Sequence, residues 1–391
     1  MKKLVLLPAF LLLISTLHGQ NGIDRVVSDI EKNNLTLRAM RQQMEAEKIG
    51  NKTGIFPANP EAGYGYLWGS PSAIGKRTDV SVEQSFDFPS AYHFRSQIAG
   101  LRDRQAESGL EQGRMQILLQ ARLLCIDLVY TNALEAELKR QLSDAGRTAE
   151  AYRLKFKTGE SGLPDYNKAQ LALLNARQAW ERNAAERKML ISALKVLNGG
   201  VAVELNDTLF PQAVIPADFE EMYRQAESGH PGIQWLQLET DVSRREVKLN
   251  DALALPGFST GYMSEKVVGE HFQGITLGIT IPLWADKNRV KFAKAKTLAA
   301  ESREIAGRME LRQSLKASYD KAAELQKMVV LYRENLAALD NSEMLLKALN
   351  MGETSLIDYL MELSLLYQSR ERLLELERDL HKTVAEMRQY L

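Results

Sequence analysis

The sequence predicts a mainly α-helical protein with a smaller β portion of membrane type, in which one order of elements is used twice. Three observations support this prediction. Long stretches rich in Ala, Leu, Glu, Lys, Arg and Gln indicate helices of unusual length. Between them stand short segments in which apolar and polar residues alternate, as they do in a strand. The segment GESGLPDY, residues 159–166, recurs as GETSLIDY, residues 352–359, with Gly, Glu, Leu, Asp and Tyr matched in place.

Residues 1–20 predict a signal peptide. Two lysines precede an apolar run from Leu4 to about Leu17, which is too short to span a bilayer comfortably and ends in polar and small residues. A buried N-terminal helix is the alternative. No cysteine follows this segment to receive a lipid, and Cys125, the only cysteine, lies in an apolar stretch where a small core residue is expected. The sequence therefore predicts an exported chain that is not lipidated and has no internal disulfide.

The recurrence extends over most of the chain. NPEAGYGY from Asn59 is answered by LPGFSTGY from Leu255, and VSVEQSFDF from Val80 by LGITIPLWA from Leu277. We therefore predict a first repeat over residues 21–197 and a second over 219–391. The linker, residues 198–218, is rich in Gly, Pro and other turn residues.

Each repeat is expected to contain a first helix, two strands, a very long helix, a tip and a returning helix. The first helices are predicted at Ile23–Asn51 and Phe219–Asp251, the long helices at about Ser90–Phe156 and Lys287–Leu349, and the returning helices at Asp165–Leu197 and Asp358–Leu391. A heptad seam in the second long helix predicts packing of coiled-coil type. Its positions are Ala322, Leu325, Val329, Tyr332, Leu336 and Leu339. Some sixty-five residues at 1.5 Å each give a charged rod of roughly 100 Å, which must lie in water.

The strands are predicted at about residues 62–69, 79–88, 257–264 and 273–284. Apolar residues alternate with polar or small ones over about ten residues, the length that a tilted membrane strand needs. The apolar positions are Val80, Val82, Phe86, Phe88, Ile275, Leu277, Ile279, Ile281 and Leu283. Aromatic residues, which favour membrane interfaces, gather in or beside these segments. They are Tyr64, Tyr66, Trp68, Phe258, Tyr262 and Trp284. A soluble sheet with one face on a core shows the same alternation and stays an alternative.

Four strands cannot close a barrel, because closure needs about eight. An open sheet in lipid would leave backbone groups unsatisfied at its edges. Strands that enter a membrane must therefore be pooled from several copies of the chain. Two, three and four copies all satisfy this argument.

The mature chain as a whole resembles the TolC family of bacterial outer-membrane efflux proteins. The resemblance is carried by the duplicated order of elements, by His230–Pro231 at the opening of the second repeat, by LPGFSTGY and ITLGITIPLW, and by the two G-x-x-x-L-x-D-Y tips. It implies a homotrimer with a 12-stranded β-barrel in the lipid of the outer membrane and a long α-helical barrel in the periplasm. It also implies that the tips meet a periplasmic adaptor (membrane fusion) protein and an inner-membrane pump.

The resemblance implies that the tips form the periplasmic gate and the adaptor contact. The residues concerned are Gly159, Glu160, Leu163, Asp165, Tyr166, Gly352, Glu353, Leu356, Asp358 and Tyr359. The residues by themselves predict helix ends at Gly159 and Gly352 and helix starts near Asp165 and Asp358. Capping explains the two aspartates structurally, and acidic groups at a narrow mouth would also favour cations. Some members carry an arginine where this chain has Thr354, so a latch of that type is not carried over.

The expected function is a passive outer-membrane exit duct of a tripartite efflux system. A soluble periplasmic coiled-coil adaptor is the alternative from another class, and a heavy-metal cation efflux component is the alternative within the family. We expect no enzyme activity, no cofactor and no metal site, because no catalytic motif stands out and His93, His230, His271 and His381 are isolated in the sequence. The balance of 50 basic and 50 acidic residues gives no field for nucleic acid.

Overall fold

The computed structural model describes residues 22–284, 287–339 and 341–390, so the predicted signal peptide lies outside the described residues. The chain divides into two compact units. We call the first the tip unit; it holds the residues up to Asn33 together with 121–213 and 331–378. We call the second the sheet unit; it holds residues 34–120, 214–330 and those from 379 onward.

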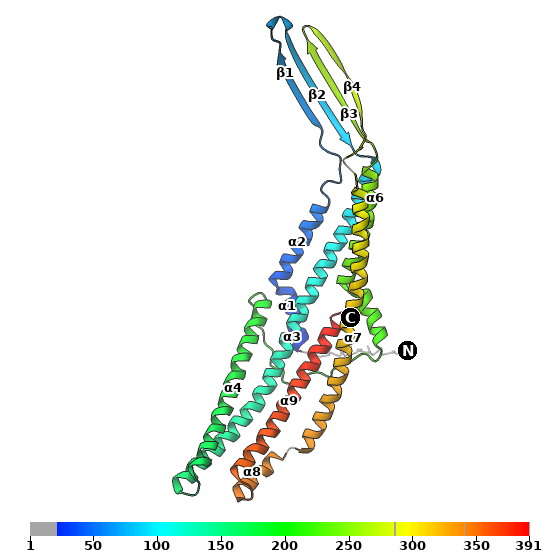
Figure 1. Ribbon diagram of the computed structural model, residues 1–391. Coiled ribbons are helices and arrows are strands. Elements are labelled where there is room, and N and C mark those ends of the chain that lie inside the picture. The colour runs from blue at the N-terminus through cyan, green and yellow to red at the C-terminus, as the bar shows by residue number, and fades with distance from the viewer. Residues whose placement is uncertain (1–21, 285–286, 340, 391) are drawn as a thin grey trace, which may run out of the picture. The chain divides into compact units, whose positions relative to one another are not determined.

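The elements follow one another in a similar order in the two halves of the chain (Figure 1). The first half contains α1 (Gly22–Asn33), α2 (Leu35–Asn51), β1 (Glu61–Trp68), a 3-10 turn η1 (Ser72–Ile74), β2 (Lys76–Phe86), α3 (Pro89–Thr158) and α4 (Leu163–Leu197). The second contains α5 (Phe219–Gly229), α6 (Pro231–Leu253), β3 (Gly257–Val267), β4 (Glu270–Thr280), α7 (Arg289–Leu339), α8 (Ser342–Met351) and α9 (Leu356–Arg388).

The prediction of one continuous first helix in each half is wrong. Asn34 separates α1 from α2, and its side-chain oxygen accepts a hydrogen bond from the backbone N–H of Leu37 at 2.9 Å. His230 separates α5 from α6, and its Nδ1 accepts from the N–H of Gly232 at 2.9 Å. Both residues have extended backbone angles and cap the helix that follows, so each break is a helix start inside the predicted span.

The long helix predicted at 287–349 is also two helices, α7 and α8. The break includes Asn341. Asparagine is unfavourable inside a helix, because its side chain can form hydrogen bonds with nearby backbone groups in other conformations. The predicted heptad seam is buried at Ala322 and Val329, whereas Leu339, at its far end, is 65% exposed.

The four strands form one antiparallel sheet in the order β1-β2-β3-β4. β3 and β4 are joined by Val268 and Gly269, both with positive φ, which is the geometry of a tight two-residue hairpin turn. Phe88, Ile281 and Leu283 were predicted in strands but lie beyond the ends of β2 and β4. Proline follows each of these strands within two or three residues, at 89 and 282, and it cannot donate to a ladder.

In the sheet unit, α2, α3, α6 and α7 are linked in that order by polar contacts. Lys48 of α2 lies 2.6 Å from Glu107 of α3, and Arg102 of α3 lies 2.9 Å from Glu246 of α6. Ser243 of α6 donates to Thr297 of α7 at 2.8 Å. The apolar contact between α3 and α6 is small, formed by Ile98, Leu101 and Val242. These helices therefore form a layer rather than a globular core.

In the tip unit, α3 packs against both α4 and α9. Asn183 of α4 donates to the carbonyl of Thr131 in α3 at 3.0 Å. Arg370 of α9 pairs with Glu137 of α3 at 2.8 Å, with both side chains about 15% exposed. By length and composition one stretch of α3 could cross a membrane; 39% of that stretch is buried in the structure, and Leu128 of α3 is fully buried.

Candidate functional site

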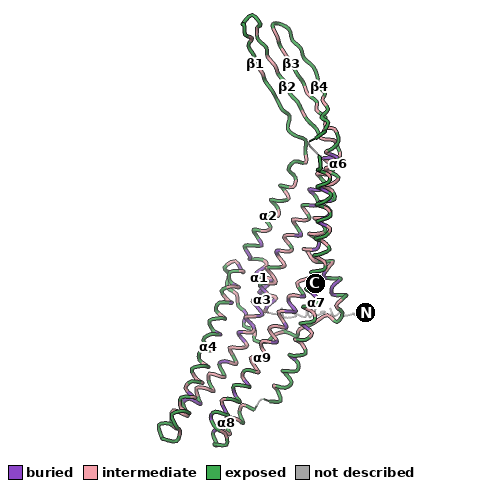
Figure 2. The backbone as a smooth tube through the Cα atoms, in the orientation of Figure 1, coloured by how far each residue is buried: buried purple, intermediate pink, exposed green. Residues whose placement is uncertain are grey.

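The sheet has one apolar face, which is exposed. Directly opposed residues share a face in an antiparallel sheet, and the register pairs Tyr64 with Val80, Val82 with Tyr262, and Tyr262 with Ile275. The face gathers Tyr64, Tyr66, Trp68, Val80, Val82, Phe86, Phe258, Tyr262, Ile275, Leu277 and Ile279. Its polar members are Lys76, Thr78, Gln84, Thr260, Ser264, Lys266, His271 and Gln273, most of them toward the hairpin turns. None of the residues in the four strands is buried (Figure 2), and Leu277 is 83% exposed. Exposed apolar patches of this size mark a contact with lipid or another protein.

The opposite face is made mostly of small and polar residues, and it also carries four apolar ones, Leu67, Met263, Val267 and Phe272. It carries Gly63, Gly65, Ser81, Glu83, Ser85, Ser259, Gly261, Gly274, Thr276, Gly278 and Thr280. Space is short at Gly261, where a Cβ atom would lie 2.7 Å from the carbonyl oxygen of Val82. The acidic residues of this face, Glu61, Asp79, Glu83, Glu265 and Glu270, outnumber its one arginine, Arg77. A sheet with one apolar face and one wet face is the pattern of a membrane barrel wall.

Both edges of this sheet are open. Within the part of the chain that the structure describes, no strand pairs with the outer side of β1 or of β4. An edge strand presents unpaired N–H and C=O groups, which cannot lie in hydrocarbon unless another strand covers them. A wall of this kind is therefore incomplete in one chain.

The tips have the local geometry predicted from the sequence. Gly159 and Gly352 have φ of 79° and 75°, in the left-handed region that ends helices. The N–H groups of Glu160 and Glu353 donate back to the carbonyls of Lys155 and Ala348, at 2.8 and 2.9 Å. The helix ends predicted at the two glycines are thus confirmed.

The start of α9 is also as predicted. The hydroxyl of Ser355 accepts from the N–H of Asp358 at 3.2 Å and donates to the Asp358 carboxylate at 2.5 Å. The corresponding start of α4 has Gly162 at the N-cap without a side-chain bond, and Pro164 in the first turn. Serine and proline therefore start the two returning helices by different means.

The tip residues divide into exposed and buried sets. Gly159, Glu160, Leu163, Gly352, Glu353 and Asp358 are exposed, whereas Asp165 and Tyr166 are half-buried. Asp165 pairs with Lys168 at 3.2 Å, and Tyr166 stacks on Phe156. Leu356 and Tyr359 are only 4% and 2% exposed and pack with Ala149, Ala169, Leu349 and Leu363. These two side chains therefore hold the tips together within one chain.

Solved structures of outer-membrane channels superimpose on most of this chain. A crystal structure of CusC, from a study of transmembrane channel formation, superimposes with a TM-score of 0.80 at 13% identity, covering 94% of this chain and 92% of that one. The outer membrane protein VceC from Vibrio cholerae gives 0.79 at 12% identity, over 94% and 95%. The CmeC outer membrane channel of Campylobacter jejuni gives 0.77 at 15% identity, over 94% and 85%.

The chain has the fold of outer-membrane efflux channels. This confirms, at the level of fold, the resemblance to the TolC family that the sequence motifs indicated. Comparison with protein-family models found no match, and comparison with curated proteins found none. At identities of 12–15% the likeness concerns the fold alone.

The efflux-channel fold of this chain contains a polar row between α3 and α9 that the sequence analysis missed. Tyr367 of α9 donates its hydroxyl to the carboxylate of Asp144 in α3 at 2.7 Å, and Arg147 pairs with the same carboxylate. Burial, followed by the hydrogen bond to Asp144, raises the pKa of Tyr367. Further along, Gln141 donates to Glu371 at 3.2 Å. Polar residues at steps of three and four in α3 were the available signal.

The described residues contain no group of three or more His, Cys, Asp or Glu side chains that could hold a metal ion. Cys125 is buried, and desolvation raises the pKa of its thiol to about 12, so it is not a thiolate nucleophile at neutral pH. The two-faced sheet and the exposed tips are features of this fold that can contact lipid or a partner protein.

Proposed function

We propose that the protein is an outer-membrane exit duct of a tripartite efflux system. In this proposal the apolar face of the sheet meets lipid and the polar face lines an aqueous path. Substrates pass without energy input from this chain, because a partner pump supplies it. The observation that carries the proposal is a two-faced sheet with both edges open, on a chain with an efflux-channel fold.

Three copies would pool twelve strands, with β4 of one chain pairing with β1 of the next. This closes both edges and leaves no unpaired backbone in the hydrocarbon. The strand count excludes a barrel from one copy, and the resemblance to the TolC family selects three. The two structural repeats, residues 21–197 and 219–391 with the linker 198–218, would then give pseudo-sixfold walls below the barrel.

The tips are proposed as the periplasmic mouth. Three chains would present six tips, and their exposed residues, including Glu160, Leu163, Glu353 and Asp358, are available to a periplasmic adaptor protein. The row around Asp144 and Tyr367 joins α3 to α9 within one chain, so a widening of the mouth that separates these helices must break it. In this proposal the chain is exported with its signal removed, and it spans the outer membrane and periplasm.

The test is to fractionate the membranes, extract the full chain in mild detergent and determine its mass by light scattering. We expect it in the outer membrane, with a mass of three mature chains. A soluble periplasmic species would support the adaptor alternative, and a membrane-bound monomer would refute the pooled barrel. A deletion strain, complemented with the wild-type gene as control, should then become more susceptible to toxic compounds.

A further inference from the structure

Just below the sheet, the sheet unit carries a groove whose charged lining residues are mostly basic. It has a volume of about 1260 Å³ and lies between α3, α6 and α7. Its basic residues are Arg104, Arg244, Arg245, Lys248 and Lys294, and its acidic residues are Asp241, Asp251 and Glu301. The groove is therefore positive, although the chain as a whole is neutral.

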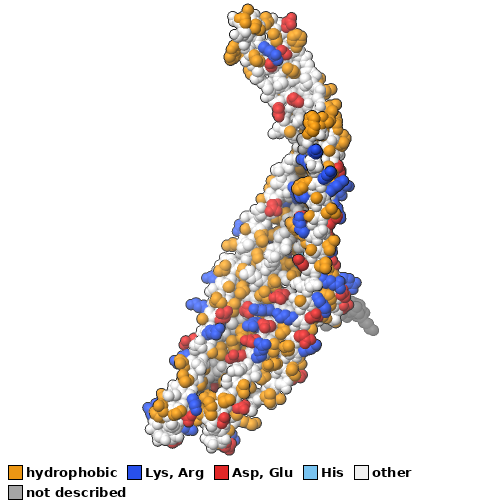
Figure 3. All heavy atoms as spheres, viewed as in Figure 1, with side chains coloured by type: hydrophobic (Ala, Val, Ile, Leu, Met, Phe, Trp, Pro, Cys, Tyr) orange, Lys and Arg blue, Asp and Glu red, His pale blue; other side chains and the backbone are white. Residues whose placement is uncertain are grey.

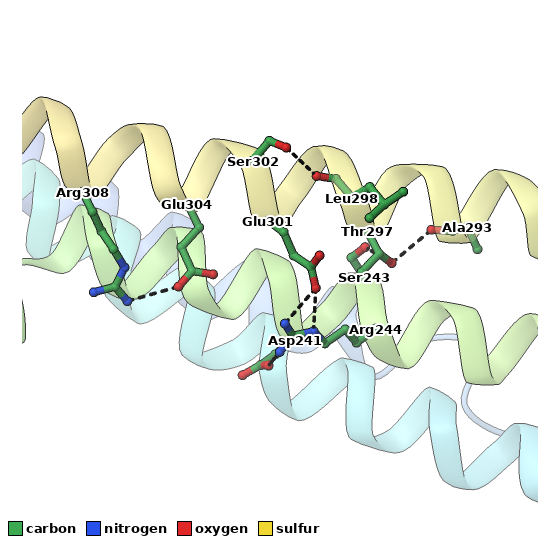
Figure 4. A network of polar contacts seen from close by, with 10 residues as sticks. All are labelled: Asp241, Ser243, Arg244, Ala293, Thr297, Leu298, Glu301, Ser302, Glu304 and Arg308. Atoms are coloured by element: carbon green, nitrogen blue, oxygen red, sulfur yellow. Dashed lines mark hydrogen bonds and ion pairs between the residues drawn. The ribbon is translucent and has the colours of Figure 1, made fainter.

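One arginine pairs with two of the three acids, and this trio keeps a net charge of −1. Arg244 donates to Glu301 at 2.8 Å and lies 3.7 Å from Asp241. Figure 4 shows these side chains on α6 and α7. The other four cations of the groove make no ion pair within the described part of the chain. They are Arg104, Arg245, Lys248 and Lys294. Five basic against three acidic side chains give the groove a net charge of 5 − 3 = +2, and these four cations attract an anion with more than one charged oxygen.

The groove lies on the convex side of the helix layer. On α6, Val242 packs on α3 and Ser243 bonds to α7, so the directions to the two neighbours are about 100° apart. Glu246 points into that angle and reaches both Arg102 of α3 and Lys296 of α7. Arg245 and Lys248 project into the wider angle on the opposite side. In a tube wall with this curvature, they face outward.

Helix α5 lies on the same side of α7 as the groove. Arg308 and Arg312 of α7 pair with Glu227 and Glu220 of α5, at 2.6 and 2.7 Å. Glu301 lines the groove seven residues before Arg308, on the same stripe of α7. A helix layered on the inner side would obstruct a duct, so this contact also places the groove on the outside.

The groove begins close to the feet of the strands. Lys248 is five residues before the end of α6, and only residues 254–256 separate α6 from β3. Lys294 is five residues after the start of α7. Each is about 8 Å along its helix from the end nearest the sheet. On the face drawn in Figure 3, Lys and Arg side chains gather there beside hydrophobic ones.

We propose that this groove binds the phosphate of an anionic phospholipid from the membrane leaflet on the helix side. The inference rests on the proposed function, since it needs the strands to lie in the membrane. Headgroups extend about 5–8 Å beyond the hydrocarbon, within reach of flexible lysine and arginine side chains. Basic pockets at this level select anionic over zwitterionic headgroups. The bound lipid would fix the depth at which the barrel sits.

The test uses the full chain, extracted in mild detergent and incubated with dioleoyl phosphatidylglycerol or dioleoyl phosphatidylcholine. Native mass spectrometry counts the lipids retained. The wild type should retain phosphatidylglycerol preferentially. The variant Arg245→Gln/Lys248→Gln should bind it about 30-fold more weakly, because each basic residue near an anionic surface contributes about a fivefold gain. Binding of phosphatidylcholine should not change.

The matched control is Lys139→Gln/Arg140→Gln, which removes the same charge from exposed positions in the tip unit. It should bind like the wild type. Equal losses in both variants, no preference in the wild type, or displacement of the lipid by soluble glycerol phosphate would overturn the inference. So would a changed oligomeric mass in the groove variant alone, since a second copy would then cover the groove. A wild type that is not a membrane oligomer refutes the proposed function instead.

Discussion

Placing lysine at Ile275 should destabilise the protein in a membrane but not in water. Ile275 is the sixth of the eleven residues of β4, lies on the apolar face of the sheet and is 80% exposed. Eleven residues at about 3.3 Å, tilted by about 45°, span roughly 26 Å, close to the 25 Å apolar band of a membrane barrel. In the proposed barrel, a band centred on β4 would have Ile275 near its middle.

A lysine at the midplane of a lipid-facing strand costs about 2–4 kcal/mol per chain. The same substitution on a water-exposed sheet changes stability by about 0.5 kcal/mol or less. Thr276→Lys is the matched control, because the neighbouring side chain lies on the polar face and the new lysine would point into water. Its expected cost is under about 1 kcal/mol, from strand propensity.

The assay refolds both purified variants into phospholipid vesicles and measures the free energy of unfolding by urea titration. The amount of each variant in the outer membrane is measured alongside. We expect Ile275→Lys to unfold at clearly lower urea and to be depleted from the membrane. Equal behaviour of the two variants would refute the assignment of one face to lipid and the other to water.

Three further predictions concern the helical parts. Arg370→Met removes the 2.8 Å partner of Glu137 in a nearly buried site, and it should lower the free energy of unfolding by about 3 kcal/mol in thermal unfolding. Adding Glu137→Leu should recover most of this loss, because the buried charge is then gone. No recovery would contradict the argument that an unpaired buried carboxylate is costly. Burial lowers the pKa of His230 and, to about 4, that of His381, so the stability they contribute is complete above about pH 6.5 and falls as the pH drops toward 4. His230→Asn keeps a cap without a titrating group and should flatten this dependence in unfolding measured between pH 7.5 and 5, whereas an unchanged slope would exclude His230. Gly352→Ala should lower the free energy of unfolding in urea by about 1–2 kcal/mol, because φ is 75° and the strain is not due to lack of space. The control is Gly146→Ala, inside α3 and with equal space around it. It should raise the free energy of unfolding by about 0.5–1 kcal/mol.

The sequence predicted most elements because their signals are local. The alternation in β2 and β4 placed Val80, Val82, Ile275, Leu277 and Ile279 on one face, and the register agrees. The tip glycines were found because a left-handed helix end favours glycine wherever it occurs. Signals of this kind depend on a few neighbouring residues, so they can be read from the sequence without knowing which helix packs against them.

The features that the sequence did not predict depend on contacts between distant parts of the chain, or on a local signal that is weak. His230 interrupts a span that is periodic on both sides, and its role as a cap depends on which ring nitrogen is free. The contact role that the resemblance implies for Leu356 and Tyr359 stays a prediction; what the sequence did not reveal is that packing against α3 and α4 buries both side chains. The bond between Asp144 and Tyr367 joins residues 223 positions apart, a separation that no periodicity reveals.

Because both edges of the sheet are open, the barrel wall can be completed only when separate chains associate. The rate of this association depends on how many exported chains meet in the same patch of membrane, and dilution slows it while leaving each chain's helices unaffected. A chain waiting for partners presents strand edges that also invite wrong pairing. The same requirement for several chains predicts what happens when wild-type and defective chains are expressed together. If three chains assemble at random from equal pools of wild-type and edge-defective protein, only about one ring in eight is free of the defect. A single faulty strand is then dominant over the normal gene.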